Sequence, residues 1–99
     1  QAATWVGISN SEPAMSEAGW HVYILRCADD SLYTGIARDL PRRLRQHNGD
    51  LVGGPKYTRG RRPVTLLWSL AVEGHGAALQ QEIAIKRLSR QAKLELVSR

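Results

Sequence analysis

The chain has 99 residues, 42% of them apolar, and a formal net charge of +5 at pH 7. This length allows one compact domain and excludes two separate cores, and the apolar fraction excludes a disordered chain. Cys27 is the only cysteine, which excludes a disulfide framework and a cysteine-based zinc site. No apolar run approaches the roughly 20 residues that span a bilayer, and no signal segment is recognisable, so we expect a cytoplasmic protein without membrane contact.

The N-terminal part of the chain divides into a tail and a hairpin. Residues 1–19 are small and polar, and we expect a flexible tail there, part of which could precede a natural start at Met15. Residues 20–26 (WHVYILR) are rich in β-branched and aromatic side chains, which predicts a strand. Turn residues at 28–31 and a second such run at 32–37 (LYTGIA) predict a β-hairpin.

Helices and one more strand follow the hairpin. Asp39 is a good N-cap and Pro41 suits a first turn, so a helix should run to about His47 and stop at Asn48-Gly49. The further segments are a basic loop at 50–63, a buried central strand, apolar on both faces, at 64–72, a helix at 77–88 and a short helix from the Ser89 cap to Val97. This order predicts an α/β domain over residues 20–99, with a small three-stranded antiparallel or mixed sheet flanked by helices.

The positive charge is concentrated between Arg38 and Arg62. Eight cations and two acids lie in this stretch, which gives +6 and leaves the rest of the chain near neutral. Such a stretch is typical of a surface that binds a polyanion, most often nucleic acid, although a solvated surface that only favours solubility also explains it.

The first predicted helix carries a cation on its apolar side. Leu40 and Leu44 lie one turn apart and must face the sheet, and Arg43 and His47 fall on the same side. A structural explanation is that Arg43 extends along the sheet edge and that His47 ends the helix near its negative pole. We favour a functional role for Arg43 and leave both explanations of His47 open.

The second predicted helix carries a carboxylate in the same kind of place. Glu82 falls between Ala78 and Ile85 on one side and Leu79 and Ile83 on the other. A buried, unpaired carboxylate is so unfavourable that it needs a cation or a metal ion. A structural ion pair with Arg43 and a magnesium-type ion fit this position equally well.

Tyr23 and Tyr33 occupy the two strands of the predicted hairpin. If the connecting loop has an odd number of residues, odd positions pair with odd positions and both rings project from one face. Gly35 beside them would allow a ligand or backbone to approach closely. Either tyrosine alone would be an ordinary strand aromatic, whereas the pair favours a functional site.

Together these residues resemble the GIY-YIG nuclease domain. Residues 21–23 (HVY), residues 33–35 (YTG) and Arg43 follow one another at the spacing of that family. The pair of Arg43 and His47, the acidic residue Glu82 on a late helix and the loop KYTRGRRP are similar to its further motifs. The resemblance spans about residues 20 to 97. It is closest to the small, stand-alone bacterial members related to the catalytic domain of structure-specific endonucleases.

The resemblance implies a GIY-YIG-like fold and hydrolysis of DNA phosphodiester bonds, leaving 5′-phosphate and 3′-hydroxyl ends. Glu82 would bind one Mg²⁺ or Mn²⁺ ion, and Arg43 would stabilise the phosphate. Tyr23, Tyr33 or His47 would help to deprotonate the attacking water, and the choice among them stays open. The residues expected to hold flanking phosphates are Arg42, Arg45, Lys56, Tyr57, Arg59, Arg61 and Arg62.

The resemblance also implies partners. These are DNA, with branched or flapped forms included and RNA left open. A protein partner for targeting is a further expectation, and DNA repair is the expected setting. We expect a monomer or a weak homodimer. The alternatives are a nucleic-acid-binding module without catalysis and a basic domain that docks an acidic protein. An embedded Glu82 argues against both, because neither gives that carboxylate a purpose.

Overall fold

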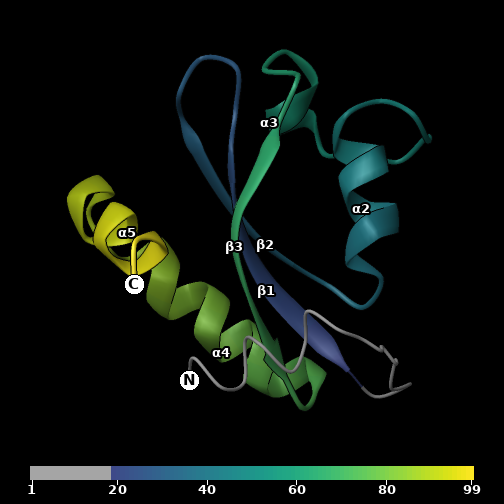
Figure 1. Cartoon of the computed structure of the whole chain (residues 1–99). Coiled ribbons are helices and arrows are strands. Elements are labelled where there is room, and N and C mark those ends of the chain that lie inside the picture. The colour runs from purple at the N-terminus through teal and green to yellow at the C-terminus, as the bar shows by residue number, and fades with distance from the viewer. Residues whose placement is uncertain (1–18) are drawn as a thin grey trace.

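The computed structural model describes residues 19–99, so all but the last residue of the expected tail lies outside the described part. The elements follow in the order β1 (Trp20–Arg26), β2 (Leu32–Ala37), α2 (Leu40–His47), α3 (Lys56–Arg59), β3 (Thr65–Val72), α4 (His75–Lys86) and α5 (Arg90–Val97). The predicted α/β class is confirmed, and the three strands are antiparallel (Figure 1). None of the helices in this part is long and apolar enough to cross a membrane.

The sheet has the strand order β2-β1-β3, so β1 is its centre. Residues Val22 to Leu25 of β1 are fully buried. The prediction of a buried central strand at residues 64–72 is therefore wrong: β3 lies at an edge, and only Ser69 within it is buried. Its side chains are apolar on both faces because both faces of the sheet are covered, with Leu66 in one core and Trp68 in the other.

The helix ends agree with the sequence in part. Oδ1 of Asp39 accepts a hydrogen bond of 3.1 Å from the backbone N–H of Arg42, which confirms the predicted cap of α2. Ser89 caps α5 in the same way. Helix α4 begins at His75 and ends at Lys86, two residues earlier at each end than predicted, because Gly74 forms its extended cap and Gly76 is tolerated inside its first turn.

The predicted basic loop at residues 50–63 contains one helical element. Its middle forms the single turn α3, in which the Thr58 hydroxyl donates to the Pro55 carbonyl over 3.2 Å. Sequence periodicity cannot detect a helix of four residues, because it needs several turns to show.

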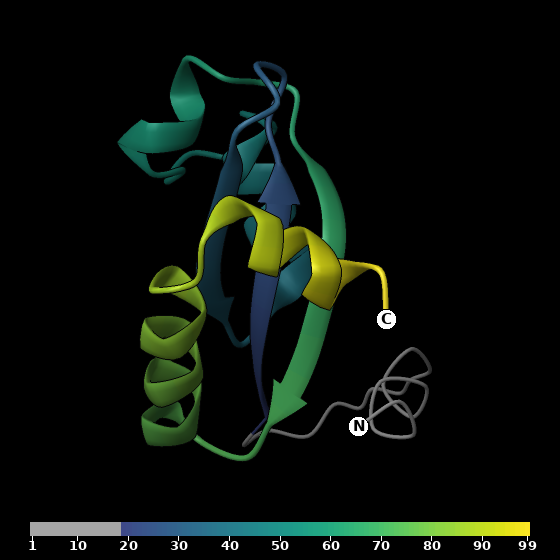
Figure 2. The ribbon, with the colours of Figure 1, turned by 90° about the vertical axis from the view of Figure 1, so that its left-hand side faces the viewer.

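Two hydrophobic cores lie on opposite faces of the sheet. The first joins Tyr23 and Leu25 of β1 to Leu40 of α2, and Cys27 is a small buried residue within it. The second joins Val22 and Ile24 to side chains of α4 and α5. Figures 1 and 2 show α2 on one side of the sheet and α4 and α5 on the other. The candidate residues on the hairpin and α2 therefore share one face, whereas Glu82 comes from the helix on the other face.

Candidate functional site

Tyr23 and Tyr33 lie side by side on the face of the sheet that α2 covers. Tyr23 pairs with Gly35 and Leu25 pairs with Tyr33, so odd positions face odd positions as predicted. The two ring centroids are 6.4 Å apart. A Cβ atom on residue 35 would come within 2.6 Å of the Tyr23 hydroxyl. Glycine is needed there because the hydroxyl of Tyr23 lies directly over the backbone of β2.

A chain of buried hydrogen bonds runs from Tyr23 into α3. The Tyr23 hydroxyl lies 2.8 Å from Nε2 of His47, and Nδ1 of His47 lies 3.0 Å from Oγ1 of Thr58. The Thr58 hydroxyl has one proton, which it donates to the Pro55 carbonyl. Its oxygen therefore acts as the acceptor for the Nδ1–H of His47. Nε2 is then the acceptor, and Tyr23 donates its proton to it. A helix-end role alone does not account for His47, which is fully buried with partners on both ring nitrogens.

Burial sets the protonation of this pair. Burial, followed by the charge of Tyr33, raises the pKa of Tyr23 to about 12, with Glu82 acting in the same direction and Arg43 against it. Burial, followed by the charges of Arg43 and Arg62, lowers the pKa of His47 to about 4. At neutral pH Tyr23 therefore keeps its proton and His47 is uncharged. Arg43 favours ionisation of Tyr23, but burial outweighs it.

Arg43 is held on one side and open on the other. Its Nη1 atom donates to Oε1 of Gln46 over 2.7 Å and to the carbonyl of Gly53 over 3.1 Å. Gln46 in turn donates through Nε2 to the carbonyl of Val52 over 3.3 Å. Within residues 19–99, no further hydrogen bond of good geometry is found for Nε or Nη2 of Arg43, but its side chain lies close enough to the Tyr23 hydroxyl to oppose the rise of the Tyr23 pKa, both as a hydrogen-bond donor and through its charge. The guanidinium is therefore oriented by Gln46 and keeps donors for a ligand such as a phosphate.

Gln46 has a role that sequence reasoning missed. Its side chain is half-buried and joins Arg43 to the loop at residues 52–53. The available signal was its spacing of three from Arg43, which brings two side chains together on a helix.

Glu82 lies at the border of the apolar face of α4. Ala78 and Ile85 are buried, whereas Ile83 is 51% exposed. The Glu82 side chain is 17% exposed and forms an ion pair of 3.3 Å with Lys86. The ion pair with Arg43 considered from the sequence is thus replaced by one within α4. Glu82 still acts electrostatically on the site, because its charge contributes to the raised pKa of Tyr23.

The donor set around Glu82 fits a hard, hydrated cation. In the part of the chain that the structure describes, no three histidine, cysteine or carboxylate side chains come together to hold a metal. A zinc site of nitrogen and sulfur ligands is therefore a poor fit. Mg²⁺ commonly binds through one or two carboxylates, several waters and substrate phosphates, so a single shielded carboxylate is compatible with it.

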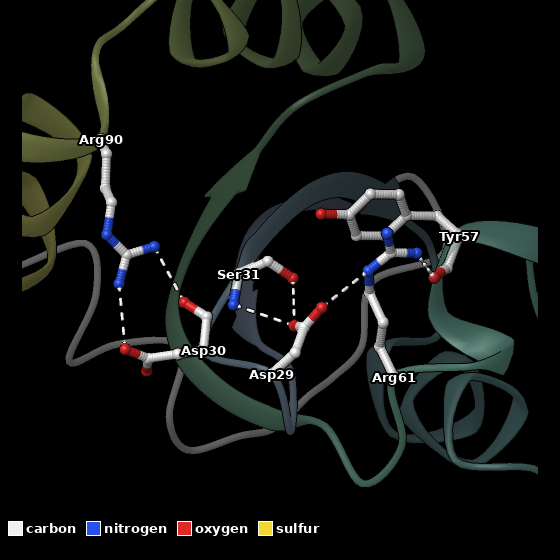
Figure 3. Close-up of polar contacts among 6 residues, drawn as sticks. All are labelled: Asp29, Asp30, Ser31, Tyr57, Arg61 and Arg90. Atoms are coloured by element: carbon white, nitrogen blue, oxygen red, sulfur yellow. Dashed lines mark hydrogen bonds and ion pairs between the residues drawn. The ribbon is translucent and has the colours of Figure 1, made fainter.

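Two arginines clamp the turn between β1 and β2 (Figure 3). Arg61 donates to Oδ2 of Asp29 over 3.0 Å, and Arg90 of α5 donates to the Asp30 carbonyl over 2.8 Å. Arg61 also lies 4.1 Å from the ring centroid of Tyr57, whose carbonyl accepts from it over 2.8 Å. The Tyr57 ring packs at 5.5 Å from that of Tyr33. Arg61 and Tyr57 therefore support Tyr33 from the basic loop.

The predicted phosphate-binding cations divide into two groups. Three have internal partners: Arg61 as above, Arg62 through a 2.7 Å bond to the His47 carbonyl, and Arg59 through a 3.4 Å bond to the Gly54 carbonyl. The side chains of Arg42, Arg45 and Lys56 are exposed and make no hydrogen bond or ion pair with other residues of 19–99. The second group is free to follow a phosphate, whereas the first group is held in place and offers only the N–H donors that its internal bonds leave unused.

The fold and this site match one class of protein. The family model of the GIY-YIG catalytic domain matches residues 19–95. The chain belongs to the GIY-YIG family, a family of endonucleases that act on nucleic acid and generally use divalent metal ions.

Its relatives include small proteins of similar length. A UPF0213 protein of Staphylococcus saprophyticus is 45% identical over 78 residues, which cover 79% of this chain and 93% of that protein. The solution NMR structure of the UPF0213 protein BH0048 from Bacillus halodurans has 42% identity and a TM-score of 0.52, over 81% of this chain and 83% of that one. The structure of the protein EF2693 from E. faecalis, also solved by NMR, has 31% identity and a TM-score of 0.55, over 84% of this chain and 88% of that one. The resemblance to small, stand-alone members is confirmed.

Proposed function

We propose that this protein is a divalent-metal-dependent endonuclease that hydrolyses DNA phosphodiester bonds at a centre formed by Tyr23, Tyr33, Arg43, His47 and Glu82. The observation that carries the proposal is the buried hydrogen bond from Tyr23 to an uncharged His47. Packing alone gives no reason to bury such a pair where the charges of Arg43 and Glu82 both act on the tyrosine.

Tyr23 and His47 form a path for the proton of the attacking water. The Tyr23 hydroxyl would take this proton while it passes its own to Nε2 of His47, so the tyrosine ends unchanged and the imidazole becomes charged. Thr58 keeps the proton of His47 on Nδ1, so Nε2 is unprotonated and can accept a proton from Tyr23. The low pKa of His47 means that the imidazolium gives up this proton readily once the reaction is complete. Tyr33 packs against both rings and would orient them.

Arg43 and Glu82 would act on the phosphate. The donors of Arg43 that are left open by Gln46 suit a non-bridging phosphate oxygen, where they would stabilise the charge of the transition state. Glu82 would hold the divalent ion, Mg²⁺ or Mn²⁺, after its ion pair with Lys86 has opened. When bound, such an ion neutralises the charge that develops on the phosphate and on the leaving oxygen.

The basic surface would bind the DNA backbone on either side of the centre. Exposed Arg42, Arg45 and Lys56 are placed to contact phosphates, with Tyr57, Arg59, Arg61 and Arg62 close by. Backbone contacts position a nucleic acid without reading its sequence, so we propose selection by structure rather than by base order, with DNA repair as a setting.

A cleavage assay tests this function. Linear, nicked, flapped and branched DNA and an RNA strand are incubated with the wild type, Glu82→Ala and Arg43→Ala, each with Mg²⁺, Mn²⁺ or EDTA. We expect metal-dependent cuts by the wild type only. Absence of cleavage under every metal condition, or undiminished cleavage by Glu82→Ala, would refute the proposal.

One observation favours a second candidate, a nucleic-acid-binding module without catalysis. The ion pair with Lys86 gives Glu82 a partner without any metal. This candidate predicts that the same DNA panel is bound but never cut, and that Glu82→Ala binds as tightly as the wild type.

A further inference from the structure

A hollow beside Arg43 lies at the end of β2 that is remote from the β1–β2 turn. It has a volume of about 300 Å³ and is bordered by Ile36 and Ala37 at the end of that strand. Three arginines, Arg38, Arg42 and Arg43, also border it. One acid, Asp39, lines it too, but its Oδ1 atom is engaged by the backbone of α2. The hollow is therefore a cationic space that opens directly next to the proposed phosphate site.

Trp20 supplies the only aromatic ring among the residues that line this hollow. Its backbone is fixed as the first residue of β1, paired with Val72, and its ring packs against the second core and stays half-exposed. The His75 ring lies 4.6 Å away, between centroids, and supports the indole. Trp20 is thus packed on one side by His75 and the second core, is half-buried, and borders the hollow.

Arg38 covers the Trp20 ring only loosely. Its guanidinium carbon is 5.9 Å from the ring centroid, whereas Arg61 reaches 4.1 Å over Tyr57 in a tight stack. Arg38 is exposed, and within residues 19–99 its side chain forms no hydrogen bond or ion pair. It can therefore move outward at little cost. An aromatic ring and a guanidinium plane are the two protein groups on which unpaired bases stack.

We propose that this hollow is a nucleotide subsite, in which one unpaired base stacks on Trp20 beneath the guanidinium of Arg38 while Arg42 binds the adjoining phosphate. The subsite deepens the proposed function, since Arg43 on its wall would hold the phosphate that is cut. A base inside a continuous duplex is stacked on its neighbours and has no free face for Trp20. The substrate class is therefore DNA that is single-stranded or unpaired at the cleavage position, and not a continuous duplex.

A binding measurement in EDTA tests the subsite without any cleavage. The probes are a fluorescein-labelled thymidine 12-mer, the same strand with abasic sites at its central positions, and a blunt duplex. The abasic strand keeps every phosphate and lacks only the bases. Dissociation constants are measured by anisotropy for the wild type, Trp20→Ala, Trp20→Phe and the control Trp68→Phe, which changes the other tryptophan of the described chain.

We expect the wild type to bind the thymidine strand about tenfold more tightly than the abasic strand, since stacking of one base on an aromatic ring has an effect of this order. Trp20→Ala should lose this preference and bind the abasic strand and the duplex as the wild type does. Trp20→Phe should keep part of the preference, and Trp68→Phe all of it. Equal weakening on both strands, or none, would overturn the subsite.

A second measurement keeps Trp20 in place and therefore tests the subsite even if Trp20→Ala does not fold. When Trp5 and Trp68 are both changed to Phe, so that Trp20 is the one tryptophan left in the chain, its emission should be quenched by the unlabelled thymidine strand and not by the abasic strand, and equal quenching by both would also overturn the subsite. The subsite and the catalytic activity can fail independently. Base-dependent binding without cleavage would support the subsite and refute the nuclease. Cleavage together with an unchanged base preference in Trp20→Ala would support the nuclease and refute the subsite.

Discussion

The hydroxyl of Tyr23 donates a hydrogen bond of 2.8 Å to Nε2 of His47, and both side chains are buried between the sheet and α2. This bond joins the central strand to the last turn of a helix 24 residues away. It fixes an uncharged histidine as the acceptor of a tyrosine proton, which is an arrangement for proton transfer as much as for packing.

Removal of this hydroxyl should affect stability and activity together. Tyr23→Phe leaves Nε2 of His47 buried without a donor, which should cost about 1–3 kcal/mol of unfolding free energy. Loss of the proton path should lower the cleavage rate by about 100-fold or more. Urea unfolding and single-turnover cleavage measure the two effects. Tyr33→Phe is the control for stability, since Tyr33 packs on His47 without bonding it, and an equal loss of stability in both variants would contradict the assignment.

His47 should make the fold sensitive to acid. Its pKa is about 4 in the folded protein and near 6.5 in the unfolded chain, so the unfolded state binds the extra proton between these values. The stabilising effect is complete above pH 6.5 and is lost as pH falls toward 4. At about 1.4 kcal/mol per pKa unit, the loss between pH 7 and 4.5 should be about 2 kcal/mol.

The matched variant for this pH effect is His47→Gln, which removes the titrating group. Urea unfolding at several pH values should show a shallower decline for the variant than for the wild type. Parallel curves would show that other groups cause the acid sensitivity.

Lys86 should compete with a metal ion for Glu82. The two side chains are 3.3 Å apart, and the ammonium group of Lys86 is exposed, so an i,i+4 pair of this kind contributes about 1 kcal/mol or less to stability. Lys86→Gln should therefore leave the unfolding free energy almost unchanged but tighten Mn²⁺ binding about threefold, whereas Glu82→Gln should abolish it. Isothermal titration calorimetry with Mn²⁺ measures both, and unchanged affinity in Glu82→Gln would place the metal elsewhere.

Gln46 should act through Arg43. Gln46→Leu removes the acceptor that holds Nη1 and keeps the apolar bulk of the side chain, so the guanidinium would lose its fixed orientation. We expect the cleavage rate to fall about tenfold, because misplaced catalytic groups are costly, while substrate affinity changes little. Gln46→Glu retains an acceptor and should recover part of the rate. A loss confined to affinity would argue for a substrate contact instead.

The division of the cations predicts two kinds of variant. Arg42→Ala, Arg45→Ala and Lys56→Ala should weaken DNA binding and each reduce the slope of log K against log salt by about one, because each would release one phosphate contact. Arg62→Ala should mainly destabilise the fold, since its guanidinium bonds the His47 carbonyl at the end of α2. If Arg62→Ala lowered the slope of log K against log salt by about one and left stability unchanged, Arg62 would be a phosphate contact and this division of the cations would be wrong.

Local patterns explain which features could be predicted from the sequence. The Asp39 cap, the facing of Leu40 and Leu44 and the parity that joins Tyr23 to Tyr33 all depend on nearby residues and regular geometry. The edge position of β3 depends on how strands pair across the fold, and two covered faces make an edge strand look like a central one.

The site was predicted less fully for the same reason. Arg43, His47 and Glu82 are polar residues at helix positions where packing would favour apolar ones, and this indicated a functional site. The contacts of His47 with Tyr23 and Thr58 join separate elements, and no spacing reveals them. The pair of Glu82 and Lys86 could have been predicted, because four residues separate them on one helix.

The most direct test of the central claim is a single-turnover cleavage assay with an end-labelled DNA that carries an unpaired segment, in Mg²⁺ and in EDTA. Wild type, Glu82→Gln and Tyr23→Phe are purified in parallel, so that a contaminating nuclease would appear in all three. We expect cleavage to 5′-phosphate ends by the wild type in Mg²⁺ alone, with both variants slower by about 100-fold or more. Equal rates in all three preparations, or no cleavage by a correctly folded wild type, would contradict it.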